Sequence, residues 1–427
     1  MAFYIVETTE QLNELFEKNY KKIFVEPIYF NDNVHPILND ISLLYLKPLC
    51  GDKGYMLCIS HSESLSLHKS HINDLLLTYD EVYVRDRKAF IFHFPAPNII
   101  DISFNLDKEI DITTQTHKFF YFKYEDKPNI NTVIPLVKHY EKCELIFDEV
   151  KKYCTIPDNW KFYNRLSNIF FIIEKNGLKI NKNVFDEFFK LQNESHSIFN
   201  NKIHTQYNLH TTTRRPSDSF NGVNFSALNK TDGCRKAFIP ENDYFIEIDI
   251  TAYHPTIVGK LIGFDFKDET PYEYFAREVN IDIKEAKVEF IKQMYGGIQD
   301  KYKDVLFFSK LSEYLENIWE EFQTTGKYTS LSGVVFKQNV LKNMNPNKLL
   351  SYLIQGAETY FNVEILWEVI KLTRKKQTQV VLYVYDSILI DYNEDENLLE
   401  QIKEIFTKHN LKIKLTKGFN YGSMITI

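Results

Sequence analysis

The sequence predicts a multidomain protein of the α/β and α+β classes, and three observations support this. Three strand-like segments followed by a helix and short strands indicate a compact α/β unit within residues 1–155. Segments with helical periodicity dominate from Asp249 to about Ala357. The two apolar runs of residues 380–391 read as a hairpin, and the helix and strands after it complete a small antiparallel α+β unit.

Length and composition limit the classes of protein that remain. The chain has 427 residues, of which 44% are hydrophobic and 15% aromatic, so it is globular and long enough for two or three domains. No apolar run approaches the ~20 residues of a membrane span, and the N-terminus lacks the pattern of a secretory signal. We therefore expect no membrane contact. The five cysteines form no C-x-x-C pair, which predicts a reducing compartment with neither a zinc site nor disulfides.

The N-terminal unit has the element order of ribonuclease-H-like domains, which many nucleases share. A helix is predicted over residues 62–77, and strands over 22–30, 41–49, 55–60, 82–85 and 98–103. Such nucleases use acidic side chains to hold catalytic metals. Here the first strand offers only Glu26 where an Asp-x-Glu pair is expected, and Phe90 stands where a later Asp would lie. The sequence favours a nuclease-shaped domain without nuclease chemistry, and the alternative is an α/β module unrelated to nucleases.

A basic segment follows three predicted helices, over residues 131–154, 160–176 and 184–198. Residues 201–240 hold six Lys or Arg and two acids, in a chain whose formal net charge is −7. The hydroxyl and amide side chains between them suit a loop that tracks phosphates, and the alternative is an ordinary solvated loop. The overall charge argues against a generally basic surface for nucleic acid, but not against a basic groove.

Two aspartates form the candidate catalytic centre. Asp249 ends an apolar strand, and Asp386 lies at the turn of the hairpin over residues 380–391. Two acids at strand ends are what a two-metal site needs to hold a pair of cations roughly 3.5–4 Å apart. The alternative is that each aspartate merely terminates its strand.

A predicted helix over residues 283–294 places Lys287, Ile291 and Tyr295 on one face, because these positions are four residues apart. A cation and an aromatic ring at the two ends of this stripe could meet the phosphates and the base of a nucleotide. The alternative is a packed helix, with Tyr295 in the core and Lys287 extending to solvent. A further helix, over residues 347–370, carries Gln355.

Five segments in order resemble the family A DNA polymerases, the pol I type. They are KIHTQYNLHTTTRRPSDSFNGVNFSALNK, GCRKAFIPENDYFIEIDITAYHP, AKVEFIKQMYGG, LIQGAE and YVYDSILI, within residues 202–427. A weaker likeness of FYNRLSNIFFIIEKNGLKIN to the passage from exonuclease domain to thumb implies a degenerate 3′–5′ exonuclease-like N-terminal domain. The last motifs are also similar to those of single-subunit phage and mitochondrial RNA polymerases.

The resemblance implies a ribonuclease-H-like N-terminal domain followed by a right-hand polymerase palm and helical fingers. The expected boundaries are residues 1–155 for the exonuclease-like domain, 156–210 for a helical connector or vestigial thumb, and 211–427 for palm and fingers, with the fingers at about 260–350. Too few residues separate Asn183 from the basic loop at Thr211 for a normal thumb. We therefore expect low processivity, or a processivity or replisome protein as a partner.

The resemblance also implies roles for particular residues. Asp249, Asp386 and the backbone carbonyl of Ile250 would bind two Mg²⁺ ions, for which Mn²⁺ could substitute. Lys287 would contact the triphosphate and protonate the leaving group. The other implied contacts are with the dNTP (His254, Ile291 and Tyr295) and with the primer-template DNA (Arg214, Arg215, Asn224, Arg235, Gln355 and Ser387).

Three of these positions depart from the family pattern. His254 stands where DNA-specific members carry a Glu that helps to exclude ribonucleotides, Ser387 where many have a second acid, and Ile291 where an aromatic or other large residue is common. The alternatives are therefore an RNA polymerase or primase, or a non-catalytic polymerase-like DNA-binding subunit. We predict a template-directed DNA polymerase without proofreading, phage- or mobile-element-encoded, in the cytoplasm of a bacterial or phage-infected host cell.

Overall fold

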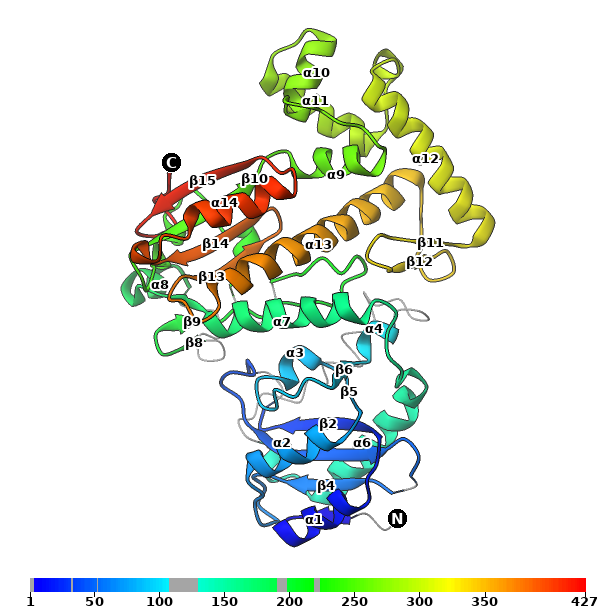
Figure 1. Cartoon of the computed structure of the whole chain (residues 1–427), viewed down its shortest axis with the longest axis vertical. Helices are drawn as coiled ribbons and strands as arrows, with labels where there is room; N and C mark the ends of the chain where they lie inside the picture. The colour runs from blue at the N-terminus through cyan, green and yellow to red at the C-terminus, as the bar shows by residue number, and fades with distance from the viewer. Residues whose placement is uncertain (1–3, 32–33, 52, 107–129, 190–197, 219–222) are drawn as a thin grey trace. The chain divides into compact units, whose positions relative to one another are not determined.

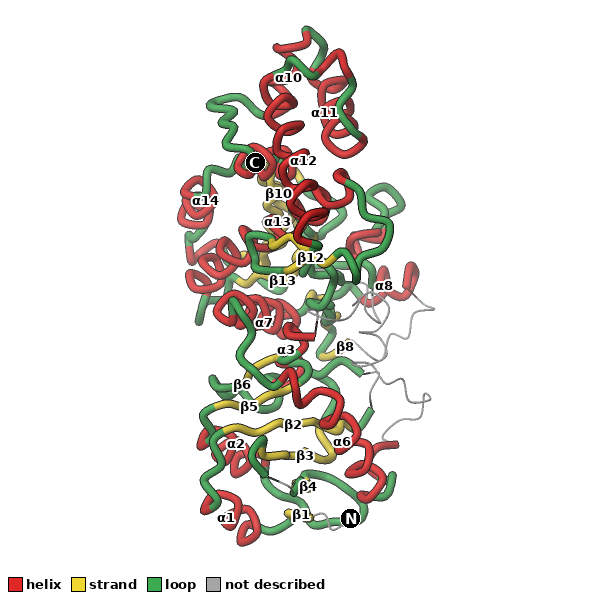
Figure 2. Tube along the Cα trace, turned by 90° about the vertical axis from the view of Figure 1, so that its right-hand side faces the viewer, coloured by secondary structure: helices red, strands yellow, loops and turns green. Residues whose placement is uncertain are grey.

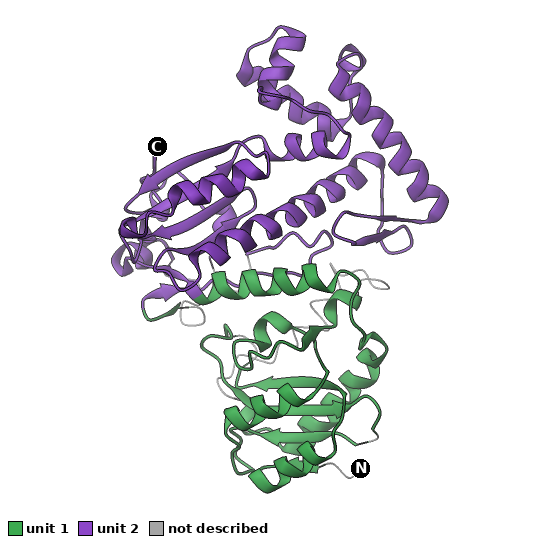
Figure 3. Cartoon of the chain, viewed as in Figure 1, with its two compact units in different colours: residues 1–175, 191–200 green, residues 176–190, 201–427 purple. Residues whose placement is uncertain are grey.

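The computed structural model describes residues 4–31, 34–51, 53–106, 130–189, 198–218 and 223–427. The chain divides into two compact units (Figure 3). Unit 1 comprises residues 1–175 and 191–200, and unit 2 comprises residues 176–190 and 201–427.

Unit 1 is built on a six-stranded mixed sheet (Figure 1). Its strands are β1 (Tyr4–Val6), β2 (Lys22–Tyr29), β3 (Ile41–Pro48), β4 (Tyr55–Cys58), β5 (Glu81–Val84) and β6 (Ile99–Asp101). The order across the sheet is β1-β4-β3-β2-β5-β6. The strands β2, β3 and β4 are antiparallel, whereas β5 is parallel to β2 and β6 to β5. The five strands predicted from the sequence are confirmed, and β1, parallel to β4, is an addition.

Helices cover both faces of this sheet, as Figure 2 shows for α1 and α2 on one side and α6 on the other. Successive residues of β2 alternate between the faces, because side chains in a strand point to opposite sides. Ile23 and Val25 pack in the core with α1 and α2, and Phe24 packs in the core with α6. The helices are α1 (Thr9–Glu17), α2 (Lys69–Thr78), α3 (Arg87–Phe90), α4 (Ser103–Leu106), α6 (Leu136–Val150) and α7 (Trp160–Asn176).

Two predicted helices of unit 1 are shorter than expected. The helix predicted over residues 62–77 begins at Lys69, because the ring of His68 caps it by accepting the Ser70 amide hydrogen at 3.3 Å. The helix predicted over residues 131–154 begins after Pro135 and ends at Val150. The helix predicted over residues 160–176 is confirmed, and it ends before Gly177, whose φ is 62°.

Unit 2 holds a five-stranded antiparallel sheet in the order β13-β14-β10-β15-β16. The strands are β10 (Tyr244–Ile250), β13 (Gln379–Val384), β14 (Ser387–Tyr392), β15 (Ile413–Gly418) and β16 (Ile425–Thr426). The central strand, β10, pairs with β14 on one side and with β15 on the other. The predicted strand ending near Asp249 therefore lies beside the predicted hairpin, which is confirmed as β13 and β14.

The remaining elements of unit 2 are mainly helical. They are α8 (Lys182–Phe189), α9 (Tyr253–Leu261), α10 (Pro271–Val279), α11 (Ile283–Gly296), α12 (Leu306–Thr325), α13 (Pro346–Thr373) and α14 (Leu399–Lys408). Two pairs of short strands also belong to unit 2: β7 (Leu178–Lys179) with β9 (Lys202–Ile203), and β11 (Lys327–Thr329) with β12 (Val335–Lys337). The short strand β8 (Ile198–Phe199) belongs to unit 1.

The helices predicted over residues 283–294 and 347–370 are confirmed as α11 and α13. The helix predicted over residues 184–198 begins at Lys182 as α8, but residues 190–197 lie outside the described part of the chain. No described helix has the length and apolar character needed to cross a membrane.

We expect Phe245→Ala in β10 to lower the free energy of unfolding by about 3–5 kcal/mol, because the Phe245 side chain is 0% exposed and its loss leaves a cavity. Phe419→Ala is the matched control, since Phe419 is 72% exposed and its loss should cost less than about 0.5 kcal/mol. Urea unfolding followed by circular dichroism measures both changes. Equal effects of the two substitutions would contradict this position of β10 in the core.

Candidate active site

The two predicted aspartates lie at one end of the unit 2 sheet. In the pairing of β10 with β14, Asp249 lies opposite Ser387, the residue that directly follows Asp386. The amide of Ile250 donates a hydrogen bond to the backbone carbonyl of Asp386 at 2.9 Å. The structure therefore brings together two acids far apart in the chain, and both remain accessible to solvent although neighbouring groups partly cover their carboxylates.

Two residues with positive φ shape the chain around these acids. Tyr385, directly before Asp386, has a φ of 57° in the turn between β13 and β14. Ala252 has a φ of 50° between β10 and α9. A side chain in this left-handed region is rarely favourable, so contacts around both residues must hold them there. The two bends lead the chain away from the sheet beside each aspartate.

The surroundings disfavour the charged form of both aspartates. Partial burial raises the pKa of Asp249, and the nearby charges of Asp386 and Glu247 raise it further, while Lys230 and Lys414 offset part of the effect. Partial burial also raises the pKa of Asp386. Two neighbouring carboxylates with raised pKa values form a site where a cation is favourable.

Glu247 is a third acid near this pair, and the sequence analysis did not single it out. It lies two residues before Asp249 on β10, so the two side chains share a face. Its carboxylate accepts hydrogen bonds from Ser387 Oγ at 3.0 Å and Thr416 Oγ1 at 3.3 Å. The alternation of side chains along β10 could have identified Glu247, because it places Glu247 on the same face as Asp249.

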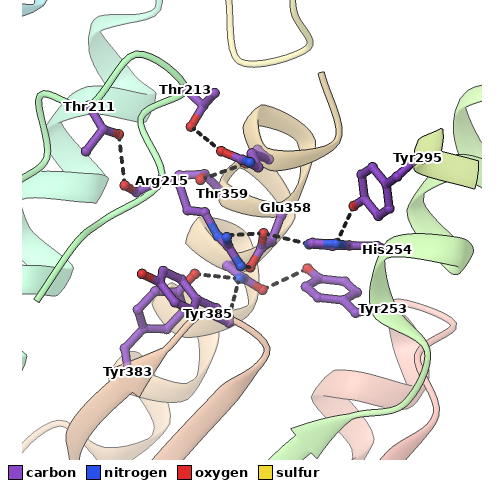
Figure 4. Close-up of polar contacts among 12 residues, drawn as sticks. Thr211, Thr213, Arg215, Tyr253, His254, Tyr295, Glu358, Thr359, Tyr383 and Tyr385 are labelled. Atoms are coloured by element: carbon purple, nitrogen blue, oxygen red, sulfur yellow. Dashed lines mark hydrogen bonds and ion pairs between the residues drawn. The ribbon is translucent and has the colours of Figure 1, made fainter. Parts of the chain in front are cut away.

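A polar network is centred on the buried carboxylate of Glu358 (Figure 4). The Glu358 side chain on α13 is 0% exposed. Its Oε2 lies 2.9 Å from Arg215 Nε and 3.0 Å from His254 Nε2, and its Oε1 accepts a hydrogen bond from Arg215 Nη2 at 3.3 Å. His254 Nδ1 in turn lies 2.6 Å from the Tyr295 hydroxyl. The network therefore joins α9, α11, α13 and the loop before residue 216.

Sequence reasoning identified Arg215, His254 and Tyr295 but missed Glu358, the residue that connects them. The signal was an acid within the LIQGAE segment, at a helix position that an apolar pattern would bury. Tyr295 is half-buried, and burial together with the charge of Glu358 raises the pKa of its hydroxyl, which therefore stays protonated.

The same network reaches the turn that carries Asp386. The Arg215 guanidinium lies 3.7 Å from the centre of the Tyr385 ring, over its face. Asn362 on α13 donates hydrogen bonds to the Tyr385 carbonyl at 3.0 Å and to the Tyr383 hydroxyl at 2.8 Å. Its side-chain oxygen accepts a hydrogen bond from the Tyr253 hydroxyl at 2.7 Å. These contacts fix the turn against α13.

The two neighbouring arginines of the basic loop have different surroundings. Arg215 is partly exposed, whereas the Arg214 side chain is 1% exposed and has a φ of 62°. Gln355 is half-buried, and its Oε1 accepts a hydrogen bond from Thr213 Oγ1 at 3.1 Å. The loop is therefore attached to α13 at two points, through Gln355 and through Glu358.

The other predicted site residues lie apart from this network. Lys287 is exposed on α11, with its Nζ 5.8 Å from the centre of the Tyr272 ring, and Ile291 is half-buried one turn further. Arg235 donates to the Leu228 carbonyl at 3.1 Å and stacks on Tyr421. Asn224 is exposed.

Carboxylate and carbonyl oxygens are the donors that Mg²⁺ prefers, so the donor set of Asp249, Asp386 and the Ile250 carbonyl fits this ion by its chemistry. The neighbouring negative charges that raise the pKa of Asp249 are also what a divalent cation would neutralise.

The comparisons with known proteins identify the fold. No family model matches the chain, and no curated protein sequence matches it. Among solved structures, the chain is similar to the POL domain of Pol1 from M. smegmatis in complex with DNA primer-template and dNTP, with a TM-score of 0.68 at 11% identity over 99% of each chain.

The chain therefore has a polymerase-domain fold. More particularly, it has the fold of the Pol1 POL domain along nearly its whole length. The predicted mixed α/β, multidomain polymerase architecture is confirmed at this level.

We expect Asp249→Asn to raise the stability of the metal-free protein at pH 7. The folded chain holds a proton on Asp249 more tightly than the unfolded chain does, so the charged form destabilises the fold. This destabilisation is absent at a pH below the ordinary aspartate pKa of about 3.9 and complete above the raised folded value. The gain from the substitution should therefore vanish as the pH falls. Urea unfolding in EDTA at a series of pH values measures it, and a loss of stability at pH 7 would contradict the proposed repulsion.

Proposed function

We propose that the chain is a template-directed DNA polymerase of the family A type, which adds deoxynucleotides to a primer 3′ end. The observation that carries this proposal is the meeting of Asp249 and Asp386 at one end of the unit 2 sheet, in a chain with the fold of a POL domain. The Pol1 structure of that fold holds DNA primer-template and dNTP.

In this proposal Asp249, Asp386 and the Ile250 carbonyl hold two Mg²⁺ ions, with Mn²⁺ as a substitute. Bound there, the ions would supply activation of the primer hydroxyl and stabilisation of charge on the departing pyrophosphate. The exposed Lys287 contacts the triphosphate and provides a proton for the leaving group. Tyr295, eight residues along the same helix face, contacts the base pair that forms.

The primer and template lie along the basic loop and α13. Partly exposed Arg215 and half-buried Gln355 come from two elements that contact each other, so they offer neighbouring groups to the strands. Further proposed contacts with DNA come from Arg235, Asn224 and Ser387, and the nucleotide also contacts Ile291. The buried Arg214 side chain supports the basic loop from its interior. Processivity is low unless a processivity or replisome protein assists.

We also propose that unit 1 is a ribonuclease-H-like domain without nuclease activity. Glu26, the acid of β2, is buried and forms an ion pair with Arg85, whose Nε donates to Glu26 Oε2 at 2.7 Å. A carboxylate whose charge is matched by a guanidinium is a poor ligand for a cation. Phe90 is 0% exposed in α3 and belongs to the core.

We expect no Mg²⁺- or Mn²⁺-dependent shortening of a 5′-labelled single-stranded DNA. The reason is that Arg85 already neutralises the charge of Glu26. Denaturing gel electrophoresis after incubation without nucleotides measures it. Shortening that is lost in Glu26→Gln would contradict the proposal that unit 1 has no nuclease activity.

A second candidate function is an RNA polymerase or primase. His254 favours it because DNA-specific members carry a Glu at that position, and Ser387 favours it because the RNA polymerase relatives also have a serine there. A non-catalytic DNA-binding subunit is a third. Both alternative functions are proposed from the sequence alone. The same holds for a phage or mobile-element origin and for a location in the cytoplasm of a bacterial or infected cell.

We expect the wild-type chain to extend a labelled DNA primer on a DNA template with dNTPs and Mg²⁺, and Asp386→Ala to reduce the rate at least about a thousandfold through the loss of a metal ligand. Parallel reactions with NTPs distinguish the first two functions. Asp395→Ala is the matched control, since Asp395 lies in a different turn, after β14. Preference for NTPs would favour the RNA polymerase, and extension by Asp386→Ala equal to wild type would remove the site assignment.

A further inference from the structure

The buried carboxylate of Glu358 determines how His254 is hydrogen-bonded. An ionised carboxylate only accepts hydrogen bonds, so the proton of the imidazole must lie on Nε2, 3.0 Å from Glu358 Oε2. In the neutral ring, Nδ1 then accepts a hydrogen bond from the Tyr295 hydroxyl at 2.6 Å. The carboxylate thereby selects one tautomer of the ring. Figure 4 shows the imidazole held between Glu358 and Tyr295.

Glu358 also has a structural reason to keep both of its partners. The side chain is 0% exposed, and a buried charge is unfavourable unless it is paired and hydrogen-bonded. Arg215 supplies the opposite charge and His254 a further hydrogen bond to the same oxygen, Oε2. A shift of the imidazole would therefore leave part of a buried carboxylate unsatisfied, which makes the ring position rigid.

His254 lies between the proposed phosphate site and the proposed base site. It is the second residue of α9, five residues after Asp249, and its ring is hydrogen-bonded to Tyr295 on α11. Arg215 pairs with the same Glu358 oxygen and lies over the ring of Tyr385, the residue directly before Asp386. A nucleotide has its sugar between phosphates and base. If the phosphates lie at the aspartates and the base at Tyr295, the sugar faces His254.

We propose that Glu358 is a positioning residue that sets the choice between deoxyribose and ribose by holding the His254 imidazole against the sugar of the incoming nucleotide. This inference rests on the proposed function for the location of the nucleotide. The two sugars differ by one hydroxyl, and a polar group discriminates between them only when its position is fixed. Glu358 supplies that rigidity from α13, an element separate from α9 and α11.

The test measures nucleotide binding without nucleotide transfer. The wild-type chain is assembled with a primer-template whose primer ends in a dideoxynucleotide, and dGTP or GTP opposite a template C is titrated in with Mg²⁺ by isothermal calorimetry. Glu358→Gln keeps the size of the side chain and removes its charge. Glu368→Gln is the matched control on the same helix, because Glu368 also pairs with a lysine and a histidine, Lys408 and His409.

We expect the wild type to bind one of the two nucleotides at least about tenfold more tightly, and Glu358→Gln to reduce this preference about tenfold, the loss that a hydrogen bond to a charged group typically produces. Glu368→Gln should keep the wild-type preference. Equal binding of dGTP and GTP by the wild type would overturn the inference, as would an unchanged preference in Glu358→Gln.

Tyr295→Phe provides a second variant in case Glu358→Gln fails to fold. It removes only the hydroxyl bonded to His254 and should reduce the same preference. If both substitutions act through His254, the double variant should lose no more preference than the more affected single variant. Additive losses, or an unchanged preference in Tyr295→Phe, would overturn the inference.

Because binding is measured without transfer, the outcome is separate from that of primer extension. A chain that binds nucleotides with a Glu358-dependent preference but extends no primer would support the inference and contradict the proposed function. A chain that extends primers but shows no such dependence would do the reverse.

Discussion

The backbone hydrogen bond from Ile250 to Asp386 is the contact on which the candidate site depends. It continues the pairing of β10 with β14 to the point where each strand carries its acid. Antiparallel register fixes opposite residues to within one position, and a slip by one residue would turn Asp249 to the other face of the sheet. The distance between the two carboxylates is therefore set by the core of the sheet, and not by the loops around them.

Much of this arrangement could be predicted from local sequence. The apolar strand that ends at Asp249 located β10, and the two apolar runs of residues 380–391 located β13 and β14. The helical spacing located α11 with Lys287 and Tyr295. The ordered motifs indicated the polymerase fold, which the similarity along the whole chain confirms at the level of architecture. Helix starts were less predictable, because α2 begins at a His cap and α6 after a proline, and both depend on single residues.

The contacts that could not be predicted join residues far apart in the chain. Glu358 meets Arg215 and His254 across more than a hundred positions, and no local pattern states which buried acid pairs with which cation. The contrast between Arg214 and Arg215 has the same origin. The two are adjacent in sequence, but a positive φ at Arg214 turns its side chain into the interior while Arg215 pairs with Glu358 at the edge of solvent.

Ala252 and Tyr385 adopt left-handed backbone conformations, which strain the chain beside the two aspartates. Each costs of order 1–3 kcal/mol, which the packing of α9 and the contacts of Asn362 with the turn must offset. Glycine would relieve that strain, yet it would also free the chain on either side of the two acids. A glycine at either position should therefore make the chain more stable and the position of the neighbouring aspartate less precise.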